Sequence, residues 1–375
     1  MKVIAFYTND LENRGPCYLS SKNKLDYIFS VFNSLNEKYE VLSLCTENKE
    51  KKRPCKNEEK ICTVYYMNSY SRNNIITKIL HLLFDPVKTF FFLIKHIKKE
   101  EVVYIYHSTA YYKIVKLIKK IKKFKMILEV EEVYGDVSKN EKQRKKEYDF
   151  FRYADAFVFP TELLNQKVNK ENRPFVIIHG TYQVEEERSN NRFDDNENVI
   201  HCVYAGTLDP RKGGAMAAVS ATQFLPENYH LHILGFGTEI DKKRIAEKIK
   251  DISAKSKAKV TYDGILSGEN YVRFLQRCEI GLSTQNPMAK FNDTSFPSKI
   301  LSYLANGLQV VTVKIPVVEI SGVGDLCTYY EKQNPEDIAE AIVLASKKRN
   351  VDCRKRIDEL AKKFEKEIST VLTIA

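Results

Sequence analysis

The sequence contains no tryptophan, no Cys-x-x-Cys pair and no close grouping of histidines. Its eight cysteines are scattered, so neither a zinc site nor a disulfide framework is expected, and a reducing cytoplasm is favoured. The first residues enter an apolar segment directly, without the pattern of a signal peptide. The most apolar run, residues 79–97, is interrupted by Asp85-Pro86, Lys88 and Lys95, so no membrane-spanning helix is expected.

Positive charge is in excess, because 60 Lys and Arg stand against 49 Asp and Glu, a formal net charge of +11. A basic chain of this kind attracts nucleic acid, anionic lipid or small anionic ligands. No motif of a nucleic-acid-binding module occurs, so the last two partners are expected and nucleic acid is not. At 375 residues the chain exceeds the size at which one core keeps growing, which predicts two domains.

The first half of the chain alternates predicted strands and helices. Residues 3–7 form an apolar strand, residues 8–21 a loop that contains Gly15, and residues 22–36 a helix with one apolar face. This order is how a Rossmann-like domain begins, and ligands of such domains gather at the carboxyl ends of the strands. Gly15 is therefore a candidate binding residue, with an ordinary loop glycine as the alternative.

Two stretches of the first half predict basic amphipathic helices. Residues 75–99 indicate two helices separated at Asp85-Pro86, and residues 112–123 indicate another in which apolar residues alternate with lysines. Such helices can lie on an anionic bilayer, at about 1 kcal/mol per Lys near the surface. In the alternative interpretation the apolar faces pack on the sheet and the lysines only keep the surface soluble.

One stretch of the second half, residues 293–313, carries the pattern loop, helix, glycine stop and apolar strand. Pro297 suits the first position of the helix, where its missing N–H is not needed. Ser298 and Lys299 then fall in the first turn, where free N–H groups and a nearby cation attract phosphate. An ordinary α/β connection with a solvated Lys299 fits the same pattern.

Residues 296–300, Phe-Pro-Ser-Lys-Ile, and residues 303–307, Tyr-Leu-Ala-Asn-Gly, add a more specific signal. Together they resemble the donor-sugar signature of two-domain GT-B glycosyltransferases, near the large family of retaining bacterial enzymes that assemble polysaccharides and glycoconjugates (group 1, family 4 type). In that family a Glu that grips the nucleotide ribose stands where this chain has Ser302, and a second Glu stands at Thr294. Both are absent here, so the resemblance defines the fold more closely than the donor.

Other segments between residues 199 and 313 resemble the same family in the same order. Residues 205–214 are similar to its Gly-Arg-Leu-x-x-x-Lys-Gly loop, with Thr207 in place of the Arg and Lys212 at the Lys. The resemblance implies that Lys212 and Lys299 clamp the donor diphosphate and act as catalytic residues. The candidate donor-binding residues are Gly15, Gly206, Thr207, Lys212, Gly235, Gly237, Gly264, Thr294, Ser298, Lys299 and Ser302.

An acidic loop, residues 129–136, leaves the strand predicted at residues 126–130. In the resembling transferases a Glu-x-His-Asp-x-aromatic-Pro-Glu run occupies this place, with Glu131 at the His and Glu132 at the Asp. A carboxylate there can take the proton of an acceptor hydroxyl, which makes Glu132 the candidate base. A surface acid cluster, or internal ion pairs with Lys139 and Arg144, is the alternative. The acceptor-side candidates are His107, Glu131 and Glu132.

The resemblance implies an α/β protein of GT-B architecture, with two Rossmann-like domains facing a central cleft and a C-terminal helix that crosses back to the first domain. The expected parts are an acceptor domain (1–184), a polar linker (185–198), a donor domain (199–350) and the final helix (351–375). The expected enzyme is a hexosyltransferase that uses a nucleotide diphosphate sugar, and a UDP-sugar is the favoured donor. Its acceptor would be a glycan, glycolipid or glycoprotein in bacterial surface polysaccharide or glycoconjugate synthesis.

The chain has no Asp-x-Asp pair, so no metal or other cofactor is expected, and lysines would neutralise the departing diphosphate. The expected location is the cytoplasm, with contact at the inner face of the membrane left open. Two other functions stay open: a degenerate subunit that lost catalysis with its Glu pair and supports a partner transferase, and an epimerase or phosphorylase of the same architecture. Retention or inversion at the anomeric centre and the oligomeric state are also left open.

Overall fold

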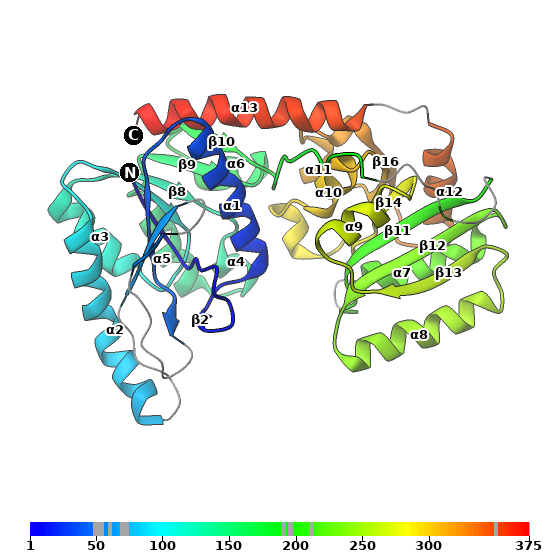
Figure 1. Ribbon diagram of the computed structural model, residues 1–375, viewed down its shortest axis with the longest axis horizontal. Coiled ribbons are helices and arrows are strands. Elements are labelled where there is room, and N and C mark those ends of the chain that lie inside the picture. Colours follow the sequence, from blue (N-terminus) through cyan, green and yellow to red (C-terminus); the bar gives the residue numbers. More distant parts are fainter. Residues whose placement is uncertain are drawn as a thin grey trace. The chain divides into compact units, whose positions relative to one another are not determined.

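The computed structural model describes residues 1–47, 56–58, 62–67, 75–188, 193, 198–210, 213–348 and 352–374. The chain divides into two compact units (Figure 1). Unit 1 comprises Met1–Ile178 and Lys363–Ala375, and unit 2 comprises His179–Lys362. Each unit is built on one largely parallel sheet with helices in its connections, which is the alternating pattern predicted from the sequence.

The main sheet of unit 1 has the strand order β10-β9-β8-β7-β1-β3-β6-β5. Its strands are β1 (Lys2–Ala5), β3 (Glu40–Ser43), β5 (Lys56–Glu58), β6 (Thr63–Tyr66), β7 (Val102–Tyr106), β8 (Lys125–Glu129), β9 (Ala156–Phe159) and β10 (Phe175–Ile177). Neighbouring strands pair in parallel, except that β5 runs antiparallel to β6. A small antiparallel pair joins β2 (Arg14–Gly15) to β4 (Thr46–Glu47). The order turns outward in both directions from β1, as in Rossmann-like sheets.

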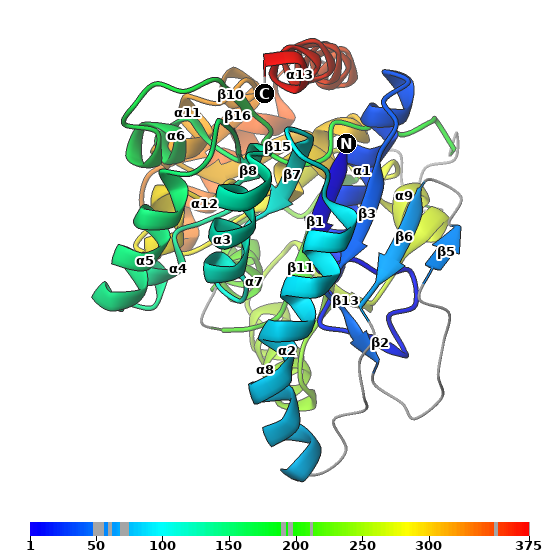
Figure 2. The same ribbon diagram turned by 90° about the vertical axis from the view of Figure 1, so that its left-hand side faces the viewer.

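Helices cover both faces of this sheet. They are α1 (Leu19–Ser34), α2 (Ile75–His96), α3 (Tyr112–Lys122), α4 (Tyr134–Val137), α5 (Glu141–Phe151) and α6 (Glu162–Val168). Helices α2 and α3 run side by side on one face, and α1 lies on the other (Figures 1 and 2). A buried core that includes Leu93, Ile118 and Phe150 joins α2, α3 and α5 to the sheet.

The sheet of unit 2 is parallel throughout its described strands, with the order β13-β12-β11-β14-β15-β16. Its strands are β11 (Ile200–Thr207), β12 (Tyr229–Phe236), β13 (Lys259–Gly264), β14 (Ile280–Ser283), β15 (Gln309–Val313) and β16 (Cys327–Tyr330). Its α-helices are α7 (Gly214–Ala221), α8 (Glu239–Ser253), α9 (Gly268–Leu275), α10 (Lys299–Ala305), α11 (Pro316–Glu319) and α12 (Pro335–Ser346). Short 3-10 helices are η1 (Thr222–Phe224), η2 (Lys290–Asp293) and η3 (Gly324–Leu326).

The last helix, α13 (Cys353–Ile374), belongs to both units, because residues up to Lys362 group with unit 2 and the rest with unit 1. Within unit 1, the ring of Phe364 stacks on Tyr27 at a centroid distance of 6.0 Å. The hydroxyl of Ser34 donates a hydrogen bond to Glu365 Oε1 at 2.6 Å. Phe364 is 1% exposed, so this end of α13 completes the packing of α1.

The predicted break at Asp85-Pro86 is wrong, because α2 is one helix with Pro86 inside it. An interior proline costs about 3 kcal/mol, since it removes one hydrogen bond and crowds the preceding turn. Burial of a single large apolar side chain contributes about 1.5–3 kcal/mol. Leu93 is fully buried on the far side of the proline, and a few such residues outweigh the local cost. None of the helices in the described parts of the chain is both long and apolar enough to cross a bilayer.

Two boundaries in unit 2 differ from the sequence prediction. Strand β11 extends to Thr207, into residues 205–214 that the resemblance assigns to a loop, because it pairs with β12 along its whole length. Helix α10 begins at Lys299, so Pro297 precedes the helix instead of opening it. The carbonyl of Pro297 still accepts a hydrogen bond from Ile300 N–H at 3.0 Å.

The described residues of the predicted linker contact unit 2. The N–H of Glu185 donates to the carbonyl of Ala305 at 3.2 Å, and Glu187 forms an ion pair with Arg354 at 2.6 Å. Residues 189–192 and 194–197 lie outside the described residues. The part that is described is therefore held along α10 and the start of α13.

Candidate functional site

The candidate donor site lies where the strand order of unit 2 changes direction. Strand β11 is flanked by β12 on one side and by β14 on the other, and the chain moves outward from it both ways. In open α/β sheets ligands bind at the carboxyl ends of the strands next to such a point. The loop after β11 leads into α7, and the loop after β14 leads into α10, so both loops predicted from the sequence meet here.

Lys299 is the first residue of α10 and is half-buried. Its Nζ lies 3.8 Å from the centroid of the Tyr204 ring, a cation–π contact. A Cβ at Gly206 would lie 2.9 Å from the same Nζ, so the ammonium lies directly against the Gly206 backbone. The ammonium is therefore held against the end of β11.

The backbone around Gly206 is closely packed. Gly206 pairs in register with Gly235 of β12, and a Cβ at Gly235 would lie 2.3 Å from the Gly206 carbonyl oxygen. Such a distance is not compatible with any side chain, so Gly235 is required by packing between the strands. A Cβ at Gly237 would lie 3.1 Å from Cβ of Leu208, so the second glycine of this turn keeps the loop after β11 close to β12.

Thr207 stands where the resembling family has an arginine, and its contacts are local. Its Oγ1 accepts a hydrogen bond from Asp209 N–H at 3.2 Å, and its carbonyl accepts one from the Tyr204 hydroxyl at 3.1 Å. Thr207 thus shapes the turn after β11 instead of supplying a charge. Lys212 and Arg211 lie outside the described residues.

Tyr303 is a positioning residue that the sequence analysis does not single out. Its hydroxyl accepts a hydrogen bond from Ala205 N–H at 2.8 Å and donates one to Leu282 O at 3.3 Å. A Cβ at Gly281 would lie 2.3 Å from the Tyr303 ring, so the ring packs directly on β14. These contacts fix α10 to β11 and β14 one helical turn from Lys299. The sequence signal for Tyr303 is its spacing, because it stands four residues after Lys299 and therefore on the same face of the helix.

The two positions that lack the family's glutamates are partly open. Ser302 is half-buried on α10, and its Oγ lies 3.4 Å from the Tyr271 hydroxyl of α9. Thr294 is half-buried and Ser298 is exposed at the start of α10. Gly264 ends β13 with φ of +83°, a left-handed conformation that favours glycine. These residues lie at the same end of the sheet as Lys299, and Gly264 belongs to the edge strand β13.

In unit 1, the acidic loop after β8 begins with a buried charge cluster. Lys24 of α1 forms an ion pair with Glu129 at 3.2 Å and a second, shorter one with Glu131. The Tyr104 hydroxyl donates to Glu129 Oε2 at 2.8 Å. Burial raises the pKa of Glu129, and the Lys24 ammonium counters that effect. Glu131 therefore pairs with Lys24, whereas Arg144, one of the partners considered for this loop, lies 3.8 Å from Asp136.

His107 lies beneath the same loop with no solvent exposure. Its ring stacks on Tyr134 at a centroid distance of 4.9 Å, and its Nε2 lies 3.5 Å from Glu147 Oε1. Burial lowers the pKa of His107 to about 3, so the ring is neutral at neutral pH. Glu147 accepts hydrogen bonds from the backbone N–H of Tyr134 and Gly135 at 2.8 and 2.6 Å. His107 therefore supports the loop from the protein interior, while Glu132 on the loop is half-buried.

Gly15 forms strand β2 and does not lie in a loop directly before a helix. Its carbonyl accepts a hydrogen bond from Thr46 Oγ1 at 3.2 Å in the β2–β4 pair. The neighbouring Arg14 is buried, with its guanidinium 3.8 Å from the centroid of the Tyr66 ring. The alternative of an ordinary structural glycine fits this geometry.

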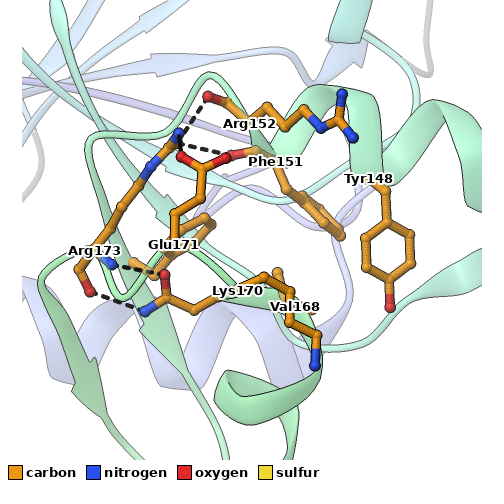
Figure 3. Close-up of a pocket in the computed structure, with 9 residues that line it drawn as sticks. Tyr148, Phe151, Arg152, Val168, Lys170, Glu171 and Arg173 are labelled. Atoms are coloured by element: carbon orange, nitrogen blue, oxygen red, sulfur yellow. Dashed lines mark hydrogen bonds and ion pairs between the residues drawn. The ribbon is translucent and has the colours of Figure 1, made fainter.

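A cavity of about 170 Å³ lies in unit 1 between α5, α6 and β9 (Figure 3). Arg173 at its rim donates to the carbonyls of Arg152 at 2.7 Å and Phe151 at 3.4 Å and pairs with Glu171. These carbonyls belong to the end of α5, just before β9 starts. The cavity thus lies at the amino end of the strand, and its arginine is engaged in capping a helix.

With these two parallel units the chain has the GT-B fold, the fold of two-domain glycosyltransferases. It is similar to sucrose-phosphate synthase from Thermosynechococcus elongatus, with a TM-score of 0.72, 12% identity and coverage of 99% of this chain and 97% of that chain. It is also similar to α,α-trehalose 6-phosphate synthase from Burkholderia multivorans (TM-score 0.66, 10% identity, coverage 99% and 95%). A third is Alr3699/HepE from Anabaena in complex with UDP and glucose (TM-score 0.64, 10% identity, coverage 100% and 99%). At the level of sequence, the chain matches no protein-family model and no curated protein.

Proposed function

We propose that this chain is a glycosyltransferase that moves a sugar from a nucleotide diphosphate sugar to a hydroxyl of a glycan, glycolipid or glycoprotein. The observation that carries the proposal is the convergence of the Lys299 ammonium, the Gly206 backbone and Tyr204 at the carboxyl end of β11. This arrangement stands in a chain whose whole length has a GT-B fold.

The proposed role of Lys299 is electrostatic. When the bond between the sugar and the diphosphate breaks, negative charge develops on the leaving phosphate oxygen. An ammonium held in place beforehand stabilises that charge without having to reorganise during the reaction. Its contact with the Tyr204 ring and its place beside Gly206 provide this preorganisation. Lys212 remains the candidate for a second cation on the same diphosphate.

We propose uridine as the nucleotide, since one of the similar structures holds UDP and glucose and another holds UDP-2-fluoro glucose. The acceptor is proposed to belong to bacterial surface polysaccharide or glycoconjugate synthesis, which rests on the resemblance of residues 296–307 to polysaccharide-assembling transferases. In unit 1 the proposed acceptor-side group is the Glu132 carboxylate on the loop that Glu147 holds.

The nucleotide is tested by measuring the melting temperature with UDP, GDP, dTDP and ADP in parallel. A ligand at one hundred times its Kd stabilises the folded state by about 2.7 kcal/mol. For domains of this size that amounts to a rise of several degrees, at about 2–4 °C per kcal/mol. We expect the largest rise with UDP and a smaller one with uridine at equal concentration. If no diphosphate raises the melting temperature, the donor site is not where we place it.

Activity is tested separately by incubation with a panel of UDP-sugars and hydroxyl acceptors. A transferase gives a glycosylated acceptor together with UDP, whereas an epimerase changes the sugar and leaves the acceptor unmodified. A degenerate subunit, suggested by Thr294 and Ser302 in place of the family's glutamates, would bind UDP without either product.

We further propose that α2 and α3 contact an anionic membrane. Apolar side chains project from both helices into solvent, among them Phe84, Phe91, Leu117 and Ile121, with 49–64% exposure. Lysines such as Lys88, Lys95, Lys113 and Lys120 stand on the same two helices. Exposed aromatic and aliphatic groups beside lysines provide the two terms, apolar burial and attraction to anionic headgroups, that hold an amphipathic helix on a bilayer.

The protein is therefore expected to co-sediment with vesicles that contain phosphatidylglycerol and to be released as salt rises, because exposed charges are screened. Phe91→Ser should weaken this binding, while the same change at Phe224, exposed in unit 2, should not. Equal binding to neutral and anionic vesicles, or none to either, would contradict membrane contact through these helices.

A further inference from the structure

Three buried histidines of unit 2 come together although they are far apart in sequence. His201 lies on β11, and His230 and His232 lie on the adjacent strand β12. The strands are in register with His201 opposite His230 and Val203 opposite His232. Because alternate residues of a strand point to the same face, all three imidazoles project from one face of the sheet. Their exposed fractions are 3%, 6% and 3%.

The nitrogens of these rings are close enough to share one ion. His201 Nδ1 lies 3.0 Å from His232 Nε2. One nitrogen from each of the three rings lies within 4.8 Å of the others, which singles out this group in the described part of the chain. In a tetrahedral site with metal–nitrogen bonds of about 2.0–2.1 Å, ligand nitrogens are about 3.3 Å apart. The first pair needs a shift of a few tenths of an ångström, and the His230 nitrogen, within 4.8 Å of the other two, has to move closer to them.

Strand β13 supplies a polar shell that fixes the tautomers of two of the rings. Asp263 Oδ2 lies 3.2 Å from His232 Nδ1, so the ring donates from Nδ1 and keeps the lone pair on Nε2. Thr261 donates its hydroxyl hydrogen to the same Asp263 oxygen at 2.8 Å. The Thr261 oxygen is then free to accept from His230 Nε2, 3.0 Å away, which leaves the lone pair of His230 on Nδ1. A carboxylate and a hydroxyl behind ligand histidines are the usual second layer of a metal site.

Aromatic rings enclose the group on the side away from the sheet. Phe193 stacks on His201 and His232 at centroid distances of 4.2 and 4.8 Å, and Phe274 of α9 meets His232 edge-on at 5.1 Å. The side chain of Asp263 is 26% exposed and provides a route from solvent.

We propose that His201, His230 and His232 bind one Zn²⁺ ion through three neutral imidazoles, with a water molecule in the fourth position and Asp263 orienting His232. Imidazole nitrogens suit zinc among the divalent metals, and zinc accepts tetrahedral geometry without strain. Because His232 Nε2 carries a lone pair, His201 Nδ1 donates the hydrogen bond between the two rings before the ion binds. When the ion binds, that hydrogen moves to Nε2 of His201, so no proton is lost from the site.

The role of this ion is structural. The histidines stand near the amino ends of β11 and β12, whereas Gly206 and Lys299 stand at the carboxyl ends. A metal at this place crosslinks the adjacent strands β11 and β12 and stabilises the folded state in proportion to its occupancy. The proposal is independent of the proposed transfer reaction and of the metal-free diphosphate site expected from the sequence.

The test begins with the full chain treated with a chelator and titrated with ZnCl₂ by calorimetry. We expect one equivalent to bind, and His232→Gln to weaken binding at least about 100-fold, since it removes a direct ligand. His96→Gln is the matched control, because His96 lies on α2 of unit 1 and its Nδ1 contacts the Phe92 carbonyl at 2.7 Å. Failure of the parent to bind zinc, or full affinity in His232→Gln, overturns the proposal.

A second variant covers the case in which the buried substitution prevents folding. Asp263→Ala alters a partly exposed side chain and should weaken Zn²⁺ binding by about 10–100-fold, the usual effect of losing a partner behind a ligand histidine. Loading with Co²⁺ should give the visible absorption of a tetrahedral site without a thiolate band in the near ultraviolet. A thiolate band, or unchanged affinity in Asp263→Ala, would show that cysteines or other groups hold the ion.

Discussion

Lys299→Ala is expected to weaken UDP binding by about 1.5–3 kcal/mol, the contribution of a hydrogen bond to a charged group. That corresponds to roughly a 10- to 150-fold rise in Kd. Uridine, which carries no phosphate, should bind the variant and the parent equally. The reason is local: the Lys299 ammonium is held over the Tyr204 ring beside Gly206, where a diphosphate can reach the backbone at the end of β11. Calorimetry with UDP and uridine separates the two contributions.

Lys242→Ala is the matched control for this experiment. It removes the same charge from unit 2, but from a half-buried position on α8 where the ammonium pairs with Glu239 at 2.8 Å. Its affinity for UDP should equal that of the parent. If Lys299→Ala binds UDP as tightly as Lys242→Ala does, then Lys299 is not a donor-site residue. Combining Lys299→Ala with Lys212→Ala should give less than the sum of the single effects if both lysines hold one diphosphate.

Glu132→Gln is expected to lower turnover by 10²- to 10⁴-fold, the usual contribution of a general base. UDP affinity should stay within about twofold, since the substitution removes a charge from unit 1 and leaves the residues around Lys299 intact. Glu132 is half-buried on a loop whose backbone is tied to the buried Glu147, so its carboxylate is held in place. Steady-state kinetics with a competent donor and acceptor provide the measurement.

Glu131→Gln is the neighbouring comparison. Glu131 pairs with Lys24, so its loss should lower stability more than turnover. The buried Lys24 ammonium would then have one carboxylate partner, Glu129, in place of two. Parental turnover in Glu132→Gln, with circular dichroism showing a folded protein, would exclude it as the base. A larger loss of turnover in Glu131→Gln than in Glu132→Gln would exchange the two assignments.

Much of the fold follows from the sequence because parallel α/β units carry strong local signals. Apolar runs mark the buried strands, and one-sided apolar patterns mark the helices between them. The place of Lys299 in the first turn of α10 was predictable for the same reason, since it follows a loop and precedes a run with helical apolar spacing. The apolar pattern did not predict the length of β11, because that length depends on pairing with β12 through Gly206 and Gly235, which are far apart in the sequence.

The parts that could not be predicted depend on pairs far apart in the chain. Lys24 reaches Glu129 and Glu131 from a different helix, while nearer basic residues looked like the natural partners. The histidine group is a similar case. His230 and His232 stand two residues apart on one strand, and His201 joins them only through the register of β11 and β12. Similarly, Pro86 stays inside α2 because residues farther along the helix, such as Leu93, are buried. The sequence around Pro86 does not show that burial.

The sharing of α13 between the two units also has a consequence for synthesis on the ribosome. Phe364 and Ile368 are buried in unit 1, yet they are translated only after the whole of unit 2. At about 5–20 residues per second, the N-terminal unit waits on the order of ten seconds or more for its last packing surface. During that interval the face of α1 that carries Tyr27 is uncovered, while unit 2 can complete its own sheet. Unit 1 therefore closes only once residues 363–374 have been made, and a chain without residues 368–374 would lack part of that packing surface, including the buried Ile368.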